Sequence, residues 1–147
     1  RSSDLVSEPK LSPAAAELLG IRGLGVLADR MGIKLLELSA ERAVATMPVE
    51  GNTQPLGLVH GGAYVVLAES LGSFAANVHA APDGYAVGIE VNATHSGSAK
   101  SGYVTATATA IQLGKTLVTH EVVITDESGR RLSTVRITNL IRKRSEA

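Results

Sequence analysis

The chain of 147 residues has no cysteine, few aromatic side chains and no excess of charge of either sign. The lack of cysteine excludes disulfides, thiol nucleophiles and thiolate metal sites, and it fits a reducing compartment, so we expect a cytoplasmic protein. Only 3% of the residues are aromatic, which leaves no base-stacking surface for single-stranded nucleic acid. Lysine plus arginine and aspartate plus glutamate each total 14, so no global field attracts nucleic acid or an anionic membrane. We expect neither as a partner.

The composition fits one domain with a short N-terminal lead-in. Hydrophobic residues make up 44% of the chain, enough for one aliphatic core. Residues 1–31 are predicted to be the lead-in. Their polar start lacks the apolar run of a secretory signal, and a short helix from Ala14 to Leu19 is predicted to end at Gly20. We expect residues 32–147 to form the single domain.

A long helix is predicted from Gly61 to Ala81, ended by the Pro-Asp-Gly run at 82–84. Apolar residues occupy almost every face of this helix, so it should be buried. Its polar residues, among them Glu69 and Asn77, argue against a membrane span.

The rest of the chain is predicted to form strands. Two of them, at 32–38 and 42–47, precede the helix. After the helix the apolar period changes to two, and four runs separated by short turns follow, at 85–94, 103–111, 116–125 and 132–141. Short connections favour antiparallel neighbours. This order predicts an α+β hotdog fold, in which a curved antiparallel sheet wraps one long central helix, and whose exposed edges favour association of two copies.

Glu69 is the only charged residue of the predicted helix. A lone carboxylate in an apolar setting has either a partner or a function. Burial should raise its pKa and so make it a stronger base, which suits a catalytic function. The alternative is a glutamate on a narrow solvent-facing strip beside Ser70, Ser73 and Asn77. Ser73, one turn beyond Glu69, either bonds the carboxylate or a water, or bonds back to the helix backbone.

The helix begins after His60 with two glycines, Gly61 and Gly62. The first N–H groups of a helix have no intrahelical acceptor, and the helix dipole adds partial positive charge. Glycine also lets a ligand approach the backbone closely, which suits an oxyanion hole. Ordinary packing of a helix start is an equal alternative. Gln54, in the loop before the helix, is a candidate to hold a water or a substrate carbonyl.

The other histidines, His79, His95 and His120, show no metal-ligand spacing, so no metal site is predicted. His95 follows a strand and is a candidate to line a pocket. His120 shares a strand face with aliphatic residues and is predicted to be a satisfied core histidine. The sequence also lacks the Gly-x-Ser-x-Gly motif of a serine hydrolase.

The stretches QPLGLVHGGAY at 54–64 and LAESLGS at 67–73 resemble hotdog thioesterases of the phenylacetate-pathway type. They are also similar to the aryl-CoA branch that includes 4-hydroxybenzoyl-CoA thioesterases. The run VNATH at 91–95 is similar to thioesterases that act on 1,4-dihydroxy-2-naphthoyl-CoA and to proofreading thioesterases of enterobactin synthesis. The resemblance covers roughly residues 32–142, and it implies hydrolysis of an acyl-CoA without metal or organic cofactor.

The resemblance also implies roles for individual residues. Glu69 matches the catalytic carboxylate, a nucleophile or general base, and Gly61 matches the backbone N–H that polarises the thioester carbonyl. His60 and Gln54 match side chains around that carbonyl and the water. Ser73 matches the hydroxyl one turn beyond the carboxylate.

Further positions concern the rest of the substrate. His95 falls where some relatives contact the acyl ring. The residues that fall where relatives contact the coenzyme are Gly114, Lys115 and Thr116. Relatives carry an arginine about where Gly97 stands, so either Lys100 replaces its charge or the coenzyme is held differently. The basic run Arg142–Arg144 either meets the coenzyme phosphates or is a solvated end.

The spacing along the helix predicts a shared site. Gly61 and Glu69 are eight residues apart, roughly 12 Å of helix rise, which is too far for both to reach one carbonyl. We therefore expect Gln54, His60 and Gly61 of one subunit to act with Glu69 of the other, in a homodimer at minimum and with a homotetramer favoured.

Two other functions fit the same fold. One is a non-catalytic module that binds acyl-CoA in the same pocket, and the other is a hotdog dehydratase, whose usual active-site pattern is not visible. For the enzyme, the bulky Tyr64 and Phe74 of the helix favour aromatic or short branched acyl groups over long chains.

Overall fold

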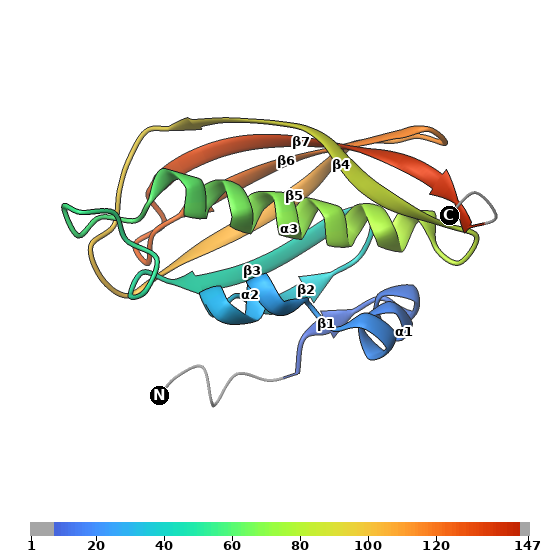
Figure 1. Ribbon diagram of the computed structural model, residues 1–147, viewed down its shortest axis with the longest axis horizontal. Coiled ribbons are helices and arrows are strands. Elements are labelled where there is room, and N and C mark those ends of the chain that lie inside the picture. The colour runs from blue at the N-terminus through green and yellow to red at the C-terminus, as the bar shows by residue number, and fades with distance from the viewer. Residues whose placement is uncertain (1–7, 145–147) are drawn as a thin grey trace.

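The computed structural model describes residues 8–144, which form one seven-stranded sheet and three helices (Figure 1). The polar residues 1–7, expected not to be a secretory signal, lie outside this range. The helices are α1 (Pro13–Arg22), α2 (Val26–Met31) and α3 (Gly61–Ala80). The strands are β1 (Lys10–Leu11), β2 (Lys34–Leu38), β3 (Arg42–Pro48), β4 (Gly84–His95), β5 (Tyr103–Leu113), β6 (Leu117–Thr125) and β7 (Arg131–Lys143).

The sheet has the strand order β1-β2-β3-β5-β6-β7-β4, and it curves around α3 (Figure 1). All neighbours are antiparallel except β1 and β2, whose parallel pairing was not predicted. The inward residues of the strands alternate with outward ones, as in the pattern of β3, and pack against α3. The predicted α+β hotdog architecture is confirmed.

The long helix packs closely on β7. A Cβ atom at Gly72 would collide with the side chain of Ile137, so glycine is required for this approach. A strip of the helix that includes Glu69, Ser70, Ser73 and Asn77 is only half-buried within the protomer, although the helix was predicted to be buried. None of the described helices is both long and apolar enough to cross a membrane.

The lead-in differs from its prediction in two ways. The first helix does not end at Gly20 but continues to Arg22, where Gly23 has a positive φ of 66° and caps it. Ser12 caps its other end by accepting a bond of 3.2 Å from the N–H of Ala15. A second helix, α2, follows and was not predicted, because its six residues are too short to show a helical period.

Strand β4 forms an edge of the sheet, since it pairs with β7 on one side only. Its twelve residues are mostly exposed, including the apolar Val87 at 41% and Ile89 at 54%. The register with β7 shifts between Gly88 and Glu90, which marks a bulge. A long edge with exposed apolar residues is a typical surface for strand pairing with another chain.

Candidate active site

His60 forms the N-cap of α3. Its Nδ1 accepts a hydrogen bond of 2.8 Å from the N–H of Gly62, and its carbonyl accepts one of 2.9 Å from Ala63. Because Nδ1 is an acceptor, the proton of a neutral ring lies on Nε2. The exposed imidazole therefore presents an N–H donor at the helix start.

Gly61 is the first residue of α3, and no described residue accepts a hydrogen bond from its N–H. That N–H lies at the positive end of the helix dipole. Together with the neighbouring imidazole of His60, it can bind an oxygen that becomes negative during a reaction. The oxyanion role of the helix start stays a prediction, and the N–H of Gly61 is able to donate in the way that this role requires.

The imidazole of His95, at the end of β4, lies over Gly61. A Cβ atom at Gly61 would lie 3.0 Å from both Cδ2 and Nε2 of this ring. The ring is held by a 2.8 Å bond between its Nδ1 and Oγ of Ser133, and it packs against Tyr64 with centroids 5.2 Å apart. Since the hydroxyl of Ser133 donates to the carbonyl of Thr94 at 3.3 Å, its oxygen accepts from Nδ1–H. Nε2 of a neutral ring then faces the helix start as an acceptor.

Gln54 lies in a hairpin loop closed by the bridge between Thr53 and Val59. Its backbone N–H donates to Leu58 at 2.8 Å, and its side-chain Oε1 accepts from the N–H of Leu56. The side-chain oxygen is therefore used within the loop. The Nε2 group has no described partner and is the part of Gln54 that can meet a ligand.

Glu69 lies near the middle of α3 and is half-buried. Its Oε2 is 2.9 Å from the place that a Cβ atom of Gly88 would occupy, so the carboxylate uses the space left by this glycine at the bulge of β4. Ser70, Ser73 and Asn77 are half-buried as well, so the strip predicted as an alternative exists. Half-buried apolar residues, Val66 among them, share it, which makes the strip amphipathic.

Ser73 donates a 3.0 Å hydrogen bond to Oδ1 of Asn139 on β7, a partner that was not among those predicted. Asn139 is fully buried, and its Nδ2 has no partner among the described residues. Asn77, one turn further along α3, instead uses both ends of its amide to tie the helix to Ala86 of β4.

Sequence reasoning missed Ser133 and Asn139. Both occupy inward positions of β7 that alternate with outward ones, where Val135 and Ile137 show that an apolar residue is the rule. A polar residue at such a position was the signal that could have found them.

The site residues form two clusters within one protomer. The helix-start cluster comprises Gln54, His60, Gly61, His95 and Ser133, and the carboxylate cluster comprises Glu69, Ser73, Gly88 and Asn139. Their supporting residues on β7, Ser133 and Asn139, are six positions apart, which corresponds to about 20 Å of strand. The helix rise of about 12 Å between Gly61 and Glu69 is shorter than this, but it is also too long for both residues to reach one carbonyl. The protomer does not bring the predicted catalytic residues to one point.

The predicted coenzyme contacts are also divided. Lys100 is exposed in the β4–β5 turn, next to Ala99, whose carbonyl accepts a 3.1 Å bond from Val59 near the start of α3. Gly114 lies near the other end of α3, where its carbonyl bonds to His79 at 2.8 Å. The neighbours of Gly114 in the same turn, Lys115 and Thr116, are exposed.

Gly97 has a structural reason to be glycine. A Cβ atom there would lie 2.9 Å from Nη1 of Arg130 and 3.2 Å from the carbonyl of Arg131. The guanidinium of Arg130 thus covers the position where relatives are expected to carry arginine. It also donates to the carbonyl of Ser98 at 2.8 Å and pairs with Asp126 at 3.3 Å.

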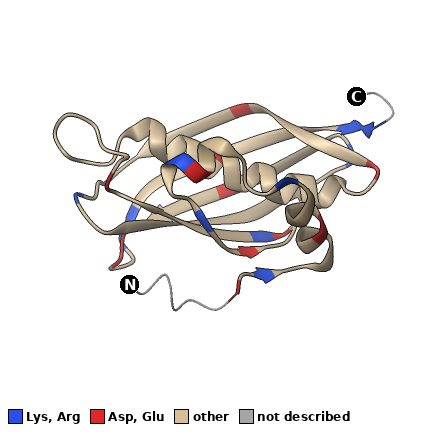
Figure 2. Ribbon diagram, turned by 60° about the horizontal axis from the view of Figure 1, so that its bottom comes forward, with Lys and Arg blue, Asp and Glu red and all other residues tan. Residues whose placement is uncertain are grey.

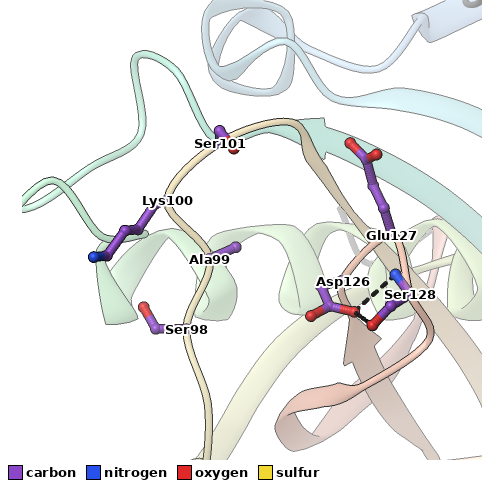
Figure 3. Close-up of a pocket in the computed structure, with 7 residues that line it drawn as sticks. All are labelled: Ser98, Ala99, Lys100, Ser101, Asp126, Glu127 and Ser128. Carbon is purple, nitrogen blue, oxygen red and sulfur yellow. Dashed lines mark hydrogen bonds between the residues drawn. The ribbon is translucent and has the colours of Figure 1, made fainter.

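A shallow surface depression lies beside this arginine, between the β4–β5 and β6–β7 turns (Figure 3). Hydrogen bonds from Ser128 and Arg130 hold the pKa of the Asp126 carboxyl at about 2, so it is ionised at neutral pH. Lys100 points away from the acidic side of the depression (Figure 3). Residues that line it are Ser98, Ala99, Lys100, Ser101, Asp126, Glu127 and Ser128.

The remaining charged and titratable groups show no second catalytic cluster among residues 8–144. Charges of both signs are scattered over the molecule (Figure 2). No group of three His, Asp or Glu in this range could hold a metal ion. Arg142–Arg144 are exposed, and Arg144 donates to the carbonyl of Pro82 at 2.8 Å.

His120 is a core residue, as predicted, on a strand face with Val118, Val122 and Ile124. It is only partly satisfied: Nε2 bonds to the carbonyl of Ala40 at 2.8 Å, whereas the buried Nδ1 has no described partner.

Comparisons with known proteins agree with this fold. A sequence model of the Thioesterase superfamily matches residues 56–133. The 1,4-dihydroxy-2-naphthoyl-CoA hydrolase of Escherichia coli (strain K12) is 38% identical over 126 residues, covering 85% of this chain and 93% of that protein. The proofreading thioesterase EntH of Cronobacter turicensis is 37% identical, covering 85% and 92%. A mutant thioesterase from Pseudomonas aeruginosa, solved by crystallography, superposes with a TM-score of 0.78 at 37% identity, covering 86% and 93%. The chain therefore belongs to the thioesterase superfamily and is a thioesterase.

Proposed function

We propose that the protein hydrolyses an aryl- or short acyl-CoA thioester to the free acid and coenzyme A, at two equivalent sites in a symmetric dimer. Each site combines the helix-start cluster of one subunit with the carboxylate cluster of the other. The observation that carries this proposal is the separation of the two clusters within one protomer. Relatives named for the hydrolysis of a naphthoyl-CoA and for proofreading thioesterase activity support this class of substrate.

The two clusters supply complementary groups. The helix-start cluster offers donors, the N–H of Gly61 and Nε2–H of His60, to the carbonyl oxygen of the thioester. The carboxylate of Glu69 either takes a proton from the attacking water or attacks the carbonyl carbon itself. In the first route the water oxygen bonds to that carbon, the carbonyl electrons move to the oxygen, and their return expels the thiolate of coenzyme A. The proton held by Glu69 then neutralises the departing sulfur.

The open edge of β4 supports a route to such a dimer. His95, which lies over Gly61, is at one end of the exposed part of β4, and Gly88, which lies under Glu69, is at the other. Antiparallel pairing of two β4 strands about a two-fold axis near Val91 and Asn92 would bring each His95 close to the partner's Gly88. This pairing would also cover the exposed side chains of Val87 and Ile89.

The predicted preference for aromatic or short branched acyl groups was based on the side chains of Tyr64 and Phe74, of which fewer are available to a substrate than expected. Tyr64 is buried at 1% exposure and bonds to the carbonyl of Gly97 at 3.4 Å, so it is not free to line an open pocket. Phe74 remains half-buried, and the ring of His95 is exposed. A preference for aromatic or short branched acyl groups predicts a higher kcat/KM for benzoyl-CoA than for palmitoyl-CoA.

The test is thiol release from a panel of aryl and alkyl CoA esters, followed by a mixed dimer. A Glu69→Ala chain and a Gln54→Ala chain, each with its own tag, are co-expressed and the mixed dimer is isolated. If sites are shared, one of its two sites is intact, and roughly half of the wild-type activity returns. A dimer of two differently tagged Glu69→Ala chains is the control.

Two outcomes would contradict the proposal. If the mixed dimer is no more active than either single variant, with Gln54→Ala nearly inactive alone, each site lies within one chain. If no ester of the panel releases thiol while a non-hydrolysable analogue binds, the protein is an acyl-CoA-binding module instead.

A further inference from the structure

Asn139 is a buried amide on a strand face where its neighbours Val135 and Ile137 are aliphatic. It is 0% exposed, two positions after Ile137 on the face of β7 that meets α3. Its Oδ1 accepts the hydroxyl proton of Ser73 at 3.0 Å, while its Nδ2 has no partner among the described residues. A buried polar group that is only half satisfied destabilises the fold, so its presence calls for an explanation.

Asn77 shows what an asparagine with a structural role looks like at this interface. Its Nδ2 donates to the carbonyls of Ser73 and Ala86, at 2.8 and 3.3 Å, and its Oδ1 accepts from the N–H of Ala86 at 2.9 Å. Both ends of that amide connect α3 to β4. Asn139 connects to α3 only through the hydroxyl of Ser73, so its effect on the fold is smaller and its effect on that hydroxyl is specific.

The bond to Asn139 decides how Ser73 can interact with anything else. A serine hydroxyl has one proton, and once Asn139 accepts it, the oxygen can only accept further hydrogen bonds. The carboxylate of Glu69, one helical turn before Ser73, offers acceptor oxygens as well. Two acceptors side by side on the half-exposed strip match the two O–H groups of one water molecule, whose lone pairs would then face away from α3.

The side chains of Asn139 and Glu69 both border the space beside Gly88. Asn139 pairs with Gly88 across β7 and β4, and a Cβ atom at Gly88 would lie 2.9 Å from Oε2 of Glu69 and 3.7 Å from Oδ1 of Asn139. The glycine at the bulge thus leaves room for the carboxylate and the amide together. The arrangement requires three elements, α3, β4 and β7, to converge on this point.

We propose that Asn139 is a positioning residue for thioester hydrolysis. It holds Ser73 as an acceptor, so that Ser73 and Glu69 together orient the attacking water. This inference rests on the proposed function and extends its general-base route, in which the oriented water attacks the thioester directly.

The test is a double-mutant cycle of Ser73→Ala and Asn139→Leu, measured by thiol release. Each single variant should lower kcat about tenfold, part of the roughly hundredfold or greater contribution of general-base catalysis, and should leave KM nearly unchanged. The double variant should be no slower than Ser73→Ala, because Asn139 acts through Ser73. Thr138→Val is the matched control, since it removes a side-chain bond to Thr119 from the other face of β7 and should not alter kcat.

Additive losses, about a hundredfold in the double variant, or an unchanged kcat for Asn139→Leu, would overturn the role of Asn139 while leaving the proposed function intact. If wild-type protein releases no thiol from any ester, both proposals fail. Should Asn139→Leu not fold, the near-isosteric Asn139→Asp retains an acceptor for Ser73 and adds negative charge beside Glu69. In this variant the decrease of kcat at low pH should begin at a higher pH than in the wild type, and an unchanged pH profile of kcat would overturn the proposal.

Discussion

The helix-start cluster and the carboxylate cluster are built in opposite ways. In the helix-start cluster, His60 and Gln54 bond to backbone N–H groups two residues away, and exposed loops surround them. In the carboxylate cluster, Ser73 bonds to a residue 66 positions away, and Glu69 depends on a glycine of another strand. The helix-start cluster offers the donors of a helix N-terminus, and the carboxylate cluster offers a carboxylate. The proposed hydrolysis needs both the helix-start donors and the carboxylate, so their separation argues for sites completed by a second subunit.

The largest effect is expected from the acceptor side. Glu69→Gln should lower kcat by at least roughly a hundredfold with the fold intact, because a neutral amide cannot act as base or nucleophile. Binding of a non-hydrolysable acyl-CoA analogue should survive. The control is Glu121→Gln, on the exposed outer face of β6, which should keep wild-type kcat. Near wild-type turnover in Glu69→Gln would make this residue part of a solvent-facing strip.

A smaller loss is expected on the donor side. His60→Asn keeps a side chain that can cap α3 but removes the Nε2–H donor, so kcat should fall about tenfold while the N–H of Gly61 still holds the oxyanion. His60→Ala should add a loss of about 1 kcal/mol in the free energy of unfolding, because the cap is gone. Urea unfolding and thiol release on the same samples separate the two roles. Equal kcat in wild type and His60→Asn would confine His60 to capping.

These two predictions concern the residues that sequence reasoning reached most easily. The bonds of His60 and Gln54 are local, so the contiguous motif from Gln54 to Gly62 contains these residues and Gly61, whereas the bond between His95 and Ser133 spans 38 positions. Glu69 stood out as the one charge on an apolar helix. The long-range partners, Gly88 and Asn139, depend on strand register and on a bulge in β4, neither of which the hydrophobic period determines.

The elements of the fold also fall into those that the sequence predicted and those that it did not. Strong periods in α3 and in β5, β6 and β7 predicted the elements and their order. The ends of α1, the whole of α2 and the parallel β1–β2 pair were missed, because they are short and set by tertiary contacts. The half-exposed strip on α3 was predicted only as the alternative interpretation of Glu69, since a helix apolar on almost every face favours burial.

Gly88→Ala tests the carboxylate cluster without changing a polar group. The added methyl would lie 2.9 Å from Oε2 of Glu69, so the carboxylate must move. We expect kcat to fall several-fold to about tenfold, since small misplacements of a catalytic group are costly. Gly129→Ala is not a suitable control because its φ of 90° is strained for alanine, whereas Gly20→Ala in α1 meets no atom within 4 Å. Unchanged kcat in Gly88→Ala would show that the carboxylate has freedom to shift.

The smallest effect is expected on the pH dependence of stability. It distinguishes the loss of stability at low pH from the loss of kcat at low pH. Burial lowers the pKa of His120 below its ordinary value of 6.5. The unfolded chain, whose histidine titrates near that value, therefore takes up a proton that the folded chain resists as the pH falls below about 6.5. The free energy of unfolding should decrease with falling pH from there toward the pKa of His120 in the folded protein.

His120→Gln, measured by urea unfolding between about pH 7.5 and 5, should show a flatter pH dependence of the free energy of unfolding. This variant should also be less stable at pH 7.5 by about 1–3 kcal/mol, because its hydrogen bonding is altered. Glu69→Gln should keep the wild-type slope while losing turnover, which assigns the pH response of stability to the core histidine and that of kcat to the carboxylate cluster. An equally steep slope in His120→Gln would place the acid-sensitive group elsewhere.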